Sequence, residues 1–468
     1  MTAADHTEPP AGGGAHPTGG DVIPLREATR AWFAISLQTF GGPAGQIAVM
    51  QHKLVDEKRW IGQRRFLHAL NYCMLLPGPE AQQLAIYTGW LLNGVRGGLI
   101  AGGLFVLPGV VALLVLSGIY VAYGETDLVA ALFAGVAPAV IAIVVHAVYR
   151  VGRRALRHPG LVAIAVGAFA ALTLFGVPFP VVVFASAVAG WLLSRRVGDL
   201  GGGSSDGGDD GPAPLVSDDA LHHELPSARR SLGVVVLGLV LWFAPVAVVA
   251  LLAGSLGTSV FTDQGLFFSG AAVVTFGGAY AVLAYVAQQA VSVYGWLAPG
   301  EMVRGLALAE TTPGPLIMVV QFVAFVGAYR NPGVLDPWVA AVLASLLVTW
   351  VTFVPCFLFV LLGAPYVERL RSNTHLSAAL TGITAGVVGV IANLAVFFSL
   401  HTLLDVTRKV QSGPVRLELP VLDTWDPVAF GITGVALAMI FWRGWSPLRT
   451  LGLCAALGLA TFVASLIR

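Results

Sequence analysis

The stretch FGGPAGQIAVMQ, residues 40–51, has a counterpart 236 residues later in FGGAYAVLAYVA, residues 276–287. In both stretches a Gly-Gly pair interrupts a run of apolar residues that otherwise has the composition of a helix. Glycine inside a helix costs roughly 1 kcal/mol relative to alanine. Two such pairs at corresponding places therefore indicate a functional feature that the chain contains twice.

The similarity extends well beyond these two stretches. Residues 38–79 align with residues 274–315 without a gap, and eleven of the 42 positions are identical. The identical positions include Phe40/Phe276, Gly41/Gly277, Gly42/Gly278, Trp60/Trp296 and the triplets Pro77-Gly78-Pro79/Pro313-Gly314-Pro315. Apolar helices can agree by composition, but agreement at glycine, proline and tryptophan is much harder to obtain by chance. We infer an internal duplication.

The composition places the chain in a membrane. Of its 468 residues, 56% are hydrophobic and 11% are charged, whereas a soluble domain has about 25% charged residues. A helix that spans a bilayer needs about 20 mostly apolar residues, and the sequence contains about thirteen apolar segments. We therefore expect an all-α polytopic protein that crosses the cell (inner) membrane several times.

A polar stretch divides the apolar segments into two blocks. We expect a disordered N-terminal tail (1–27), a first repeat (28–194), a flexible cytoplasmic linker rich in Gly, Ser and Asp (195–230) and a second repeat (231–468). The net charge of +1 gives no indication of a nucleic-acid partner. The three cysteines are scattered, which favours neither a disulfide framework nor a metal site.

The two repeats are predicted to have opposite orientations in the membrane. Seven apolar segments separate the two Phe-Gly-Gly motifs, and an odd number inverts equivalent helices. The loop 51–65 contains five Lys and Arg residues, whereas its equivalent, 287–301, contains none. Because positive residues stay on the cytoplasmic side, equivalent loops face opposite sides. The N-terminus and the linker are then cytoplasmic and the C-terminus is outside.

The positions of the basic residues leave two arrangements open. If every segment spans, the basic loop 51–65 lies outside while the basic stretch 150–157 lies inside. If segments 28–50 and 66–92 each enter and return on one side, both basic stretches lie inside. Non-helical backbone at membrane depth is tolerated only where protein or water lines it. We favour the re-entrant arrangement, in which the Gly and Pro motifs form the bends.

The two Pro-Gly-Pro triplets should each end one helix and begin another, because proline blocks the preceding turn and suits the first turn of a new helix. Each new helix start exposes unpaired N–H groups and a positive dipole end, which together favour an anion. Transporters with inverted repeats build substrate sites from such broken helices. The alternative is that the triplets are kinks that only help helices to pack.

Few ionisable side chains lie deep in the apolar segments. Glu80 follows the first triplet and Glu310 precedes the second. Intramembrane carboxylates are costly and usually functional, so these two either bind protons or cap the starts of half-helices. Arg304 is a candidate counter-charge or an interfacial arginine. The side-chain amides of Asn71, Gln82, Gln83 and Gln321 are candidate neutral donors, whereas Gln46, Asn93 and Asn393 are expected only to hold helices together.

Several of these stretches resemble the chromate ion transporter family in its long-chain, two-domain form. In the first half they are TFGGPAGQIAVMQ, RRFLHALNYCMLLPGPEAQQLAIYTGWLL and FVLPGV; in the second they are TFGGAYAVLAYV, GLALAETTPGPLIMVVQFVAFVG and ITAGVVGVIANLAVFF. The resemblance covers most of residues 28–195 and 231–465. It implies export of chromate from the cytoplasm, and some members of the family are tied to sulfate.

The predicted function is therefore a chromate exporter driven by the membrane potential or a proton gradient, and not an enzyme. The predicted substrate-binding residues are Phe40, Gly41, Gly42, Pro43, Pro77, Gly78, Pro79, Phe276, Gly277, Gly278, Pro313, Gly314 and Pro315, with Glu80 and Glu310 as proton-coupling or gating groups. We expect no cofactor or metal, and membrane lipid as surroundings. The alternatives are a sulfate or other oxyanion carrier, a membrane enzyme acting on lipid and a passive anion channel.

Overall fold

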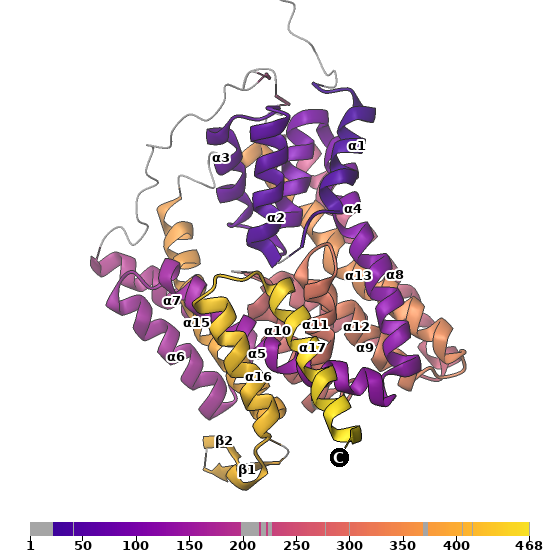
Figure 1. Cartoon of the computed structure of the whole chain (residues 1–468). Coiled ribbons are helices and arrows are strands. Elements are labelled where there is room, and N and C mark those ends of the chain that lie inside the picture. The colour runs from indigo at the N-terminus through magenta and orange to yellow at the C-terminus, as the bar shows by residue number, and fades with distance from the viewer. Residues whose placement is uncertain are drawn as a thin grey trace, which may run out of the picture.

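The computed structural model describes residues 22–40, 42–197, 215–216, 221–222, 227–276, 278–298, 300–367, 373–404, 406–413 and 415–467. Most of the predicted N-terminal tail, most of the linker, Gly41 and Gly277 lie outside the described residues. The described part is almost entirely helical, as the composition predicts, and helices of both halves surround the centre of the molecule (Figure 1).

The first half contains helices α1 to α7 and is followed by α8. Their bounds are α1 (Leu25–Ser36), α2 (Gly42–Gln51), the π-helix η1 (His52–Glu57), α3 (Gln63–Cys73), α4 (Glu80–Tyr123), α5 (Asp127–Ala155), α6 (Pro159–Phe175), α7 (Phe179–Val197) and α8 (Ala228–Leu256).

The second half repeats this order from α9 onward. Its elements are α9 (Val260–Val274), α10 (Ala279–Gln288), the π-helix η3 (Gln289–Val293), α11 (Glu301–Thr311), the 3₁₀ turn η4 (Leu316–Met318), α12 (Val319–Arg330), α13 (Pro337–Gly363), η5 (Ala364–Tyr366), α15 (Thr374–Leu403), β1 (Thr407–Ser412), β2 (Val415–Pro420), η6 (Leu422–Thr424), α16 (Pro427–Phe441) and α17 (Pro447–Ile467). A π-helix follows the Gly-Gly helix in both halves.

Helix α4 is two helices folded against each other. The chain leaves helical geometry at Asn93 and at Gly94, which has φ 59°, so residues 80–92 and 95–123 form an antiparallel hairpin. Glycines make the close approach possible: a Cβ added at Gly89 would lie 2.5 Å from the carbonyl oxygen of Gly97. The sequence prediction of a boundary between segments 66–92 and 97–123 agrees with this turn.

Four of the predicted apolar segments are re-entrant hairpins. In the first half, Lys58 after α2 forms an ion pair with Glu27 at the start of α1, with 3.2 Å between Nζ and Oε1. The amide of Val22 donates to the carbonyl of Leu92 at the end of the next hairpin. The entry and exit of segments 28–50 and 66–92 therefore share one end of the molecule, as the re-entrant arrangement predicts.

The second half has the same arrangement at the opposite end. A Cβ added at Gly327, near the end of α12, would lie 2.9 Å from both the Gln264 side chain of α9 and the Trp296 side chain that follows η3. Arg330 contacts Glu301 at the start of α11. Segments 264–290 and 303–328 thus also enter and return on one side. In Figure 1, α1, α2 and α3 lie at the top, and the β1–β2 hairpin and the C-terminus lie at the bottom.

Small residues hold helices of the two halves together. Gly135 of α5 packs directly on the backbone of Cys454 and Gly458 in α17, and its equivalent, Gly382 of α15, packs on Ser186 and Gly190 in α7. Such contacts let helix backbones approach closely inside a membrane. Because α15 packs on both α6 and α7, and α5 packs on both α16 and α17, the halves interlock rather than lying side by side.

Seven described helices are long and apolar enough to cross a membrane, counting the folded α4 as one. One element departs from the predicted all-helical content. After α15 the chain forms an antiparallel hairpin in which Thr407 pairs with Pro420 and Ser412 with Val415. Gly413, with φ 59°, lies in the turn between these strands.

Candidate functional site

Two reciprocal hydrogen bonds bring the four helix breaks together. The amide of Gly78 donates to the carbonyl of Thr275, which precedes the second Phe-Gly-Gly motif, at 2.7 Å. The amide of Gly314 donates to the carbonyl of Thr39, which precedes the first motif, at 3.0 Å. Gly78 and Gly314 are equivalent, as are Thr39 and Thr275. Each Pro-Gly-Pro triplet therefore contacts the residue that precedes the Phe-Gly-Gly motif of the other half.

The helices that follow the two hairpins also contact the Pro-Gly-Pro triplets of the opposite half. A Cβ added at Gly109 of α4 would lie 2.8 Å from the carbonyl oxygen of Pro313, and one added at Gly78 would lie 3.0 Å from the Sγ of Cys356 in α13. Gly109 and Cys356 follow the equivalent prolines 108 and 355. The helix after each hairpin thus packs against the triplet of the opposite half.

These hydrogen bonds determine which amides remain for a ligand. The amides of Gly78 and Gly314 already have carbonyl acceptors, and proline has no N–H. Helix geometry leaves the first amides of each new helix without an acceptor in their own helix. In the first half these belong to residues 80–82, and in the second half to residues 316–317. The triplet glycines shape the backbone, whereas the amides without an acceptor in their own helix lie just after them.

The Phe-Gly-Gly motifs border free space near this crossing. Gly42 is buried with φ 74°, and among the described residues no heavy atom lies within 4 Å of a Cβ added there. Gly278 has φ 102°, and its nearest such neighbour is Oε1 of Glu80 at 3.9 Å. Both glycines use backbone conformations that other residues rarely adopt. Phe40 is 36% exposed and Pro43 and Phe276 are partly buried.

The two predicted acids both lie beside the start of α10 but differ in their surroundings. Glu310 is 2% exposed, and its Oε1 accepts a 2.5 Å hydrogen bond from the Tyr280 hydroxyl, while its Oε2 has no partner among the described residues. Glu80 is partly exposed beside Gly278. The equivalents of these acids are apolar, Met74 for Glu310 and Leu316 for Glu80.

Side-chain amides contribute more than the sequence indicated. Gln46, expected only to hold helices together, donates from Nε2 to the carbonyl of Gly314 at 2.6 Å, and Gln83 donates to the carbonyl of Pro77 at 2.6 Å. Gln82, in the first turn after the first triplet, is fully buried, and both its amide atoms lack a partner among the described residues. Arg304, the candidate counter-charge, instead donates to the Tyr120 hydroxyl at 3.4 Å.

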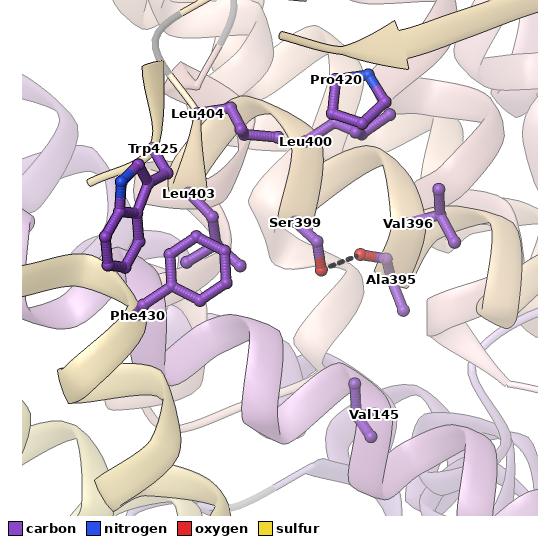
Figure 2. A pocket seen from close by; sticks show the side chains of 10 residues that line it. All are labelled: Val145, Ala395, Val396, Ser399, Leu400, Leu403, Leu404, Pro420, Trp425 and Phe430. Atoms are coloured by element: carbon purple, nitrogen blue, oxygen red, sulfur yellow. Dashed lines mark hydrogen bonds between the residues drawn. The ribbon is translucent and has the colours of Figure 1, made fainter. Parts of the chain in front are cut away.

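One described cavity lies away from this crossing and does not suit an anion. It has a volume of about 660 Å³ and is lined by α15, α16 and Val145 of α5 (Figure 2). The rings of Trp425 and Phe430 form one wall. The Ser399 hydroxyl donates to the carbonyl of Ala395 at 2.7 Å, within its own helix. The cavity therefore offers an apolar surface.

Comparisons with known proteins agree with this architecture. The family model described as "Chromate transporter" matches residues 26–191 and 262–459, one region in each half. The chain is 33% identical over 362 residues to the "Chromate transport protein" of Pseudomonas aeruginosa, covering 76% of both chains. It is 27% identical over 425 residues to the "Probable chromate transport protein" of Synechococcus elongatus, covering 89% of this chain and 96% of the relative.

A third relative, the "Chromate transport protein" of Cupriavidus metallidurans, is 26% identical over 415 residues, covering 88% of this chain and 92% of the relative. No solved structure matches the chain. The relatives are transport proteins, in agreement with the prediction that the chain is not an enzyme. With a matched region in each of two inverted halves and extensive similarity to these relatives, the chain belongs to the chromate transporter family.

Proposed function

We propose that this chain exports chromate from the cytoplasm across the inner membrane, binding the ion where the four helix breaks meet. The observation that carries the proposal is the pair of reciprocal hydrogen bonds, Gly78 to Thr275 and Gly314 to Thr39. They place each Pro-Gly-Pro triplet, and the helix start that follows it, against the threonine that precedes the Phe-Gly-Gly motif of the other half. The names of the relatives supply the substrate.

The chemistry of chromate suits this region. Chromate is a tetrahedral dianion whose oxygens accept hydrogen bonds in several directions. Amides at helix starts donate to anions and carry the positive end of the helix dipole, so the site does not require many arginines. We propose that the glycines at 41–42 and 277–278 let the backbone approach the ion, and that the triplets 77–79 and 313–315 fix the helix starts.

The membrane potential is sufficient as a driving force. Moving one charge through 100 mV yields about 2.3 kcal/mol, so the exit of a dianion from a negative interior gains about 4.6 kcal/mol. We propose that proton binding at Glu80 and Glu310 modulates this movement. Both acids border the start of α10, and a negative carboxylate there repels the substrate until it binds a proton.

Sulfate is the alternative substrate because it has the same charge and shape. Amide donors recognise charge and geometry, and they discriminate poorly between two tetrahedral dianions of similar size. Chromate uptake into inverted vesicles with increasing sulfate separates the two cases. Weak competition supports a chromate carrier, whereas sulfate uptake that exceeds chromate uptake identifies a sulfate carrier.

The site itself is tested by Gly314→Leu beside Gly103→Leu. A side chain at Gly314 enters the crossing, where a Cβ would contact Gly109 at 3.4 Å, whereas Gly103 is exposed and its added Cβ meets no described heavy atom within 4 Å. We expect saturable chromate uptake in inverted vesicles to fall at least tenfold in Gly314→Leu and to be retained in Gly103→Leu. Normal uptake by Gly314→Leu at normal protein level contradicts the site.

A further inference from the structure

A second, polar cavity lies beneath the β1–β2 hairpin. It has a volume of about 410 Å³ and lies between α6, α10, η3, α15 and the hairpin. The polar side chains that line it include those of Thr173, Gln288, Ser292, Asn393 and Glu418. A cavity of this size with several polar partners is suited to hold water molecules. Neither the proposed binding of chromate nor the family match assigns a role to it.

One face of α10 connects this cavity to the buried acid Glu310. Ala284, Gln288 and Ser292 line the cavity at intervals of four residues. Tyr280 precedes Ala284 by the same interval, so it lies on the same helix face, about 6 Å farther along the axis. The Tyr280 hydroxyl donates to Oε1 of Glu310. The cavity therefore ends one helical turn from the residue that holds Glu310.

Glu310 has the features of a group that exchanges a proton. Its second carboxylate oxygen is buried without a partner among the described residues, and carboxylates at membrane depth mark ion or proton pathways. The charged or titratable groups that act on it are Tyr280 from α10 and Arg150 from α5. The described residues of α4, α12 and α17, which also pack against α11, add none.

The mouth of the cavity faces the outer side. The opposite end of the molecule carries the basic loop 51–65 and the basic end of α5, which the positive-inside rule assigns to the cytoplasm. At the mouth, Glu418 of β2 accepts a 2.5 Å hydrogen bond from Thr407 and pairs with His401 of α15, with 3.4 Å between Oε1 and Nε2. Glu418, which lines the cavity, and its partner His401 thus lie on the hairpin side.

We propose that this cavity is the route by which protons from the outer side reach Glu310. Water in the cavity passes a proton along the Gln288 and Ser292 face of α10. The Glu310 carboxylate binds that proton, which converts hydronium to water and the carboxylate to the neutral acid. One proton enters from outside for each dianion that leaves, and its release resets Glu310. This inference rests on the proposed function and adds the side from which the coupling proton comes.

The test uses the full chain in proteoliposomes loaded with chromate at fixed internal pH while the external pH varies. In the wild type, lowering the external pH is expected to raise chromate efflux, by up to about tenfold per pH unit. Glu310→Gln is expected to show no response. Ala284→Phe, which narrows the inner end of the cavity, is expected to lose most of this response. The matched control is Val293→Phe, at an exposed position of η3, the π-helix that follows α10.

A milder pair of variants covers the case in which Ala284→Phe does not fold. Ala284→Val narrows the cavity less, and Ser292→Cys can be labelled from outside with a membrane-impermeant thiol reagent, since the three native cysteines are buried. Labelling that weakens the response to external pH supports the route. A full wild-type response in folded Ala284→Phe or in Glu310→Gln, or a response to internal pH only, overturns it. Absence of wild-type chromate efflux would instead overturn the proposed function.

Discussion

The two Pro-Gly-Pro hairpins share a backbone plan but are held in different ways. In the first half, the end of the Pro-Gly-Pro hairpin (residues 66–92) is fixed by neutral hydrogen bonds. Asn93 donates to the carbonyl of Ile23 at 2.5 Å, and the amide of His222 donates to the carbonyl of Leu91 at 2.8 Å. In the second half, Arg330 makes two hydrogen bonds to Glu301, at 2.7 and 2.9 Å.

The acids differ between the halves as well. Glu310 and Glu80 have no acidic equivalent, because Met74 and Leu316 occupy the corresponding positions. The duplication has kept the glycines and prolines that set the backbone, whereas the charges have diverged. We infer that the symmetric backbone provides the fold of the proposed site, and that the asymmetric charges provide the proposed proton coupling.

The largest effect on the free energy of unfolding is expected from alanine substitutions of the two glycines in the Pro-Gly-Pro triplets, Gly78 and Gly314. Both have positive φ, 126° at Gly78 and 103° at Gly314, so alanine is strained at both. A Cβ at Gly78 would also overlap the Gln83 side chain at 2.8 Å and Cys356 at 3.0 Å, whereas at Gly314 the nearest atom is at 3.4 Å. We expect Gly78→Ala to cost about 3 kcal/mol and Gly314→Ala about 2 kcal/mol. Thermal unfolding in detergent measures both, and equal losses would contradict the difference.

The Glu301–Arg330 ion pair, which joins the start and the end of the second hairpin, is tested by Arg330→Met. Removing one partner of a fully buried ion pair costs about 3–5 kcal/mol. The Arg330 side chain is 44% exposed while that of Glu301 is 9% exposed, so water replaces part of the interaction and we expect about 2 kcal/mol. Asn93→Ala, which removes the hydrogen bond to Ile23 in the first half, is expected to cost about 1 kcal/mol. If Asn93→Ala destabilises more than Arg330→Met, the second hairpin is not the more firmly held one.

Gln82→Met replaces a buried amide with the residue found at the equivalent position, Met318. Burial of both amide atoms without a partner is unfavourable, so the variant is expected to unfold at the same temperature or higher. If Gln82 donates to the substrate, chromate affinity falls about tenfold, because a hydrogen bond to a charged group contributes about 1.5–3 kcal/mol. Isothermal titration with the purified protein measures the affinity. Unchanged affinity would exclude Gln82 from the site.

The smallest effect is expected at an exposed pair of the first half. Lys53 contacts Glu57 four residues later, with side chains 26% and 48% exposed. Exposed pairs contribute at most about 1 kcal/mol, so Lys53→Met should leave stability and chromate flux nearly unchanged. A loss as large as that of Arg330→Met would show that an exposed pair within η1 stabilises the first half as much as the Glu301–Arg330 pair stabilises the second, and the contrast between the halves would disappear.

Much of the backbone plan could be predicted from the sequence. The positions of glycine and proline mark where helices stop, and the recurrence of Phe-Gly-Gly and Pro-Gly-Pro reveals the duplication. The basic loop 51–65, absent from its equivalent, indicates the inversion. The re-entrant arrangement follows once both basic stretches are required to lie on one side. Each of these signals can be read from the residues of one short segment or from the spacing of segments along the chain.

The contacts within the site could not be predicted in this way. That Gly78 donates to Thr275, that Gln46 reaches Gly314 and that Tyr280 holds Glu310 all depend on segments that meet only after the halves interlock. The β1–β2 hairpin was missed because its strands lie between two long apolar helices. The Glu301–Arg330 pair was missed because its residues begin and end one hairpin and are 29 residues apart in the chain.

The central claim is that breaks from opposite halves form one binding site for a dianion. Anomalous diffraction from the chromium of chromate bound to crystals of the full chain tests it most directly. The account predicts a chromium peak between the starts of α2 and α10 and the first turns after Gly78 and Gly314. A peak only in the apolar cavity beside Trp425, or only beneath the β-hairpin, would contradict it.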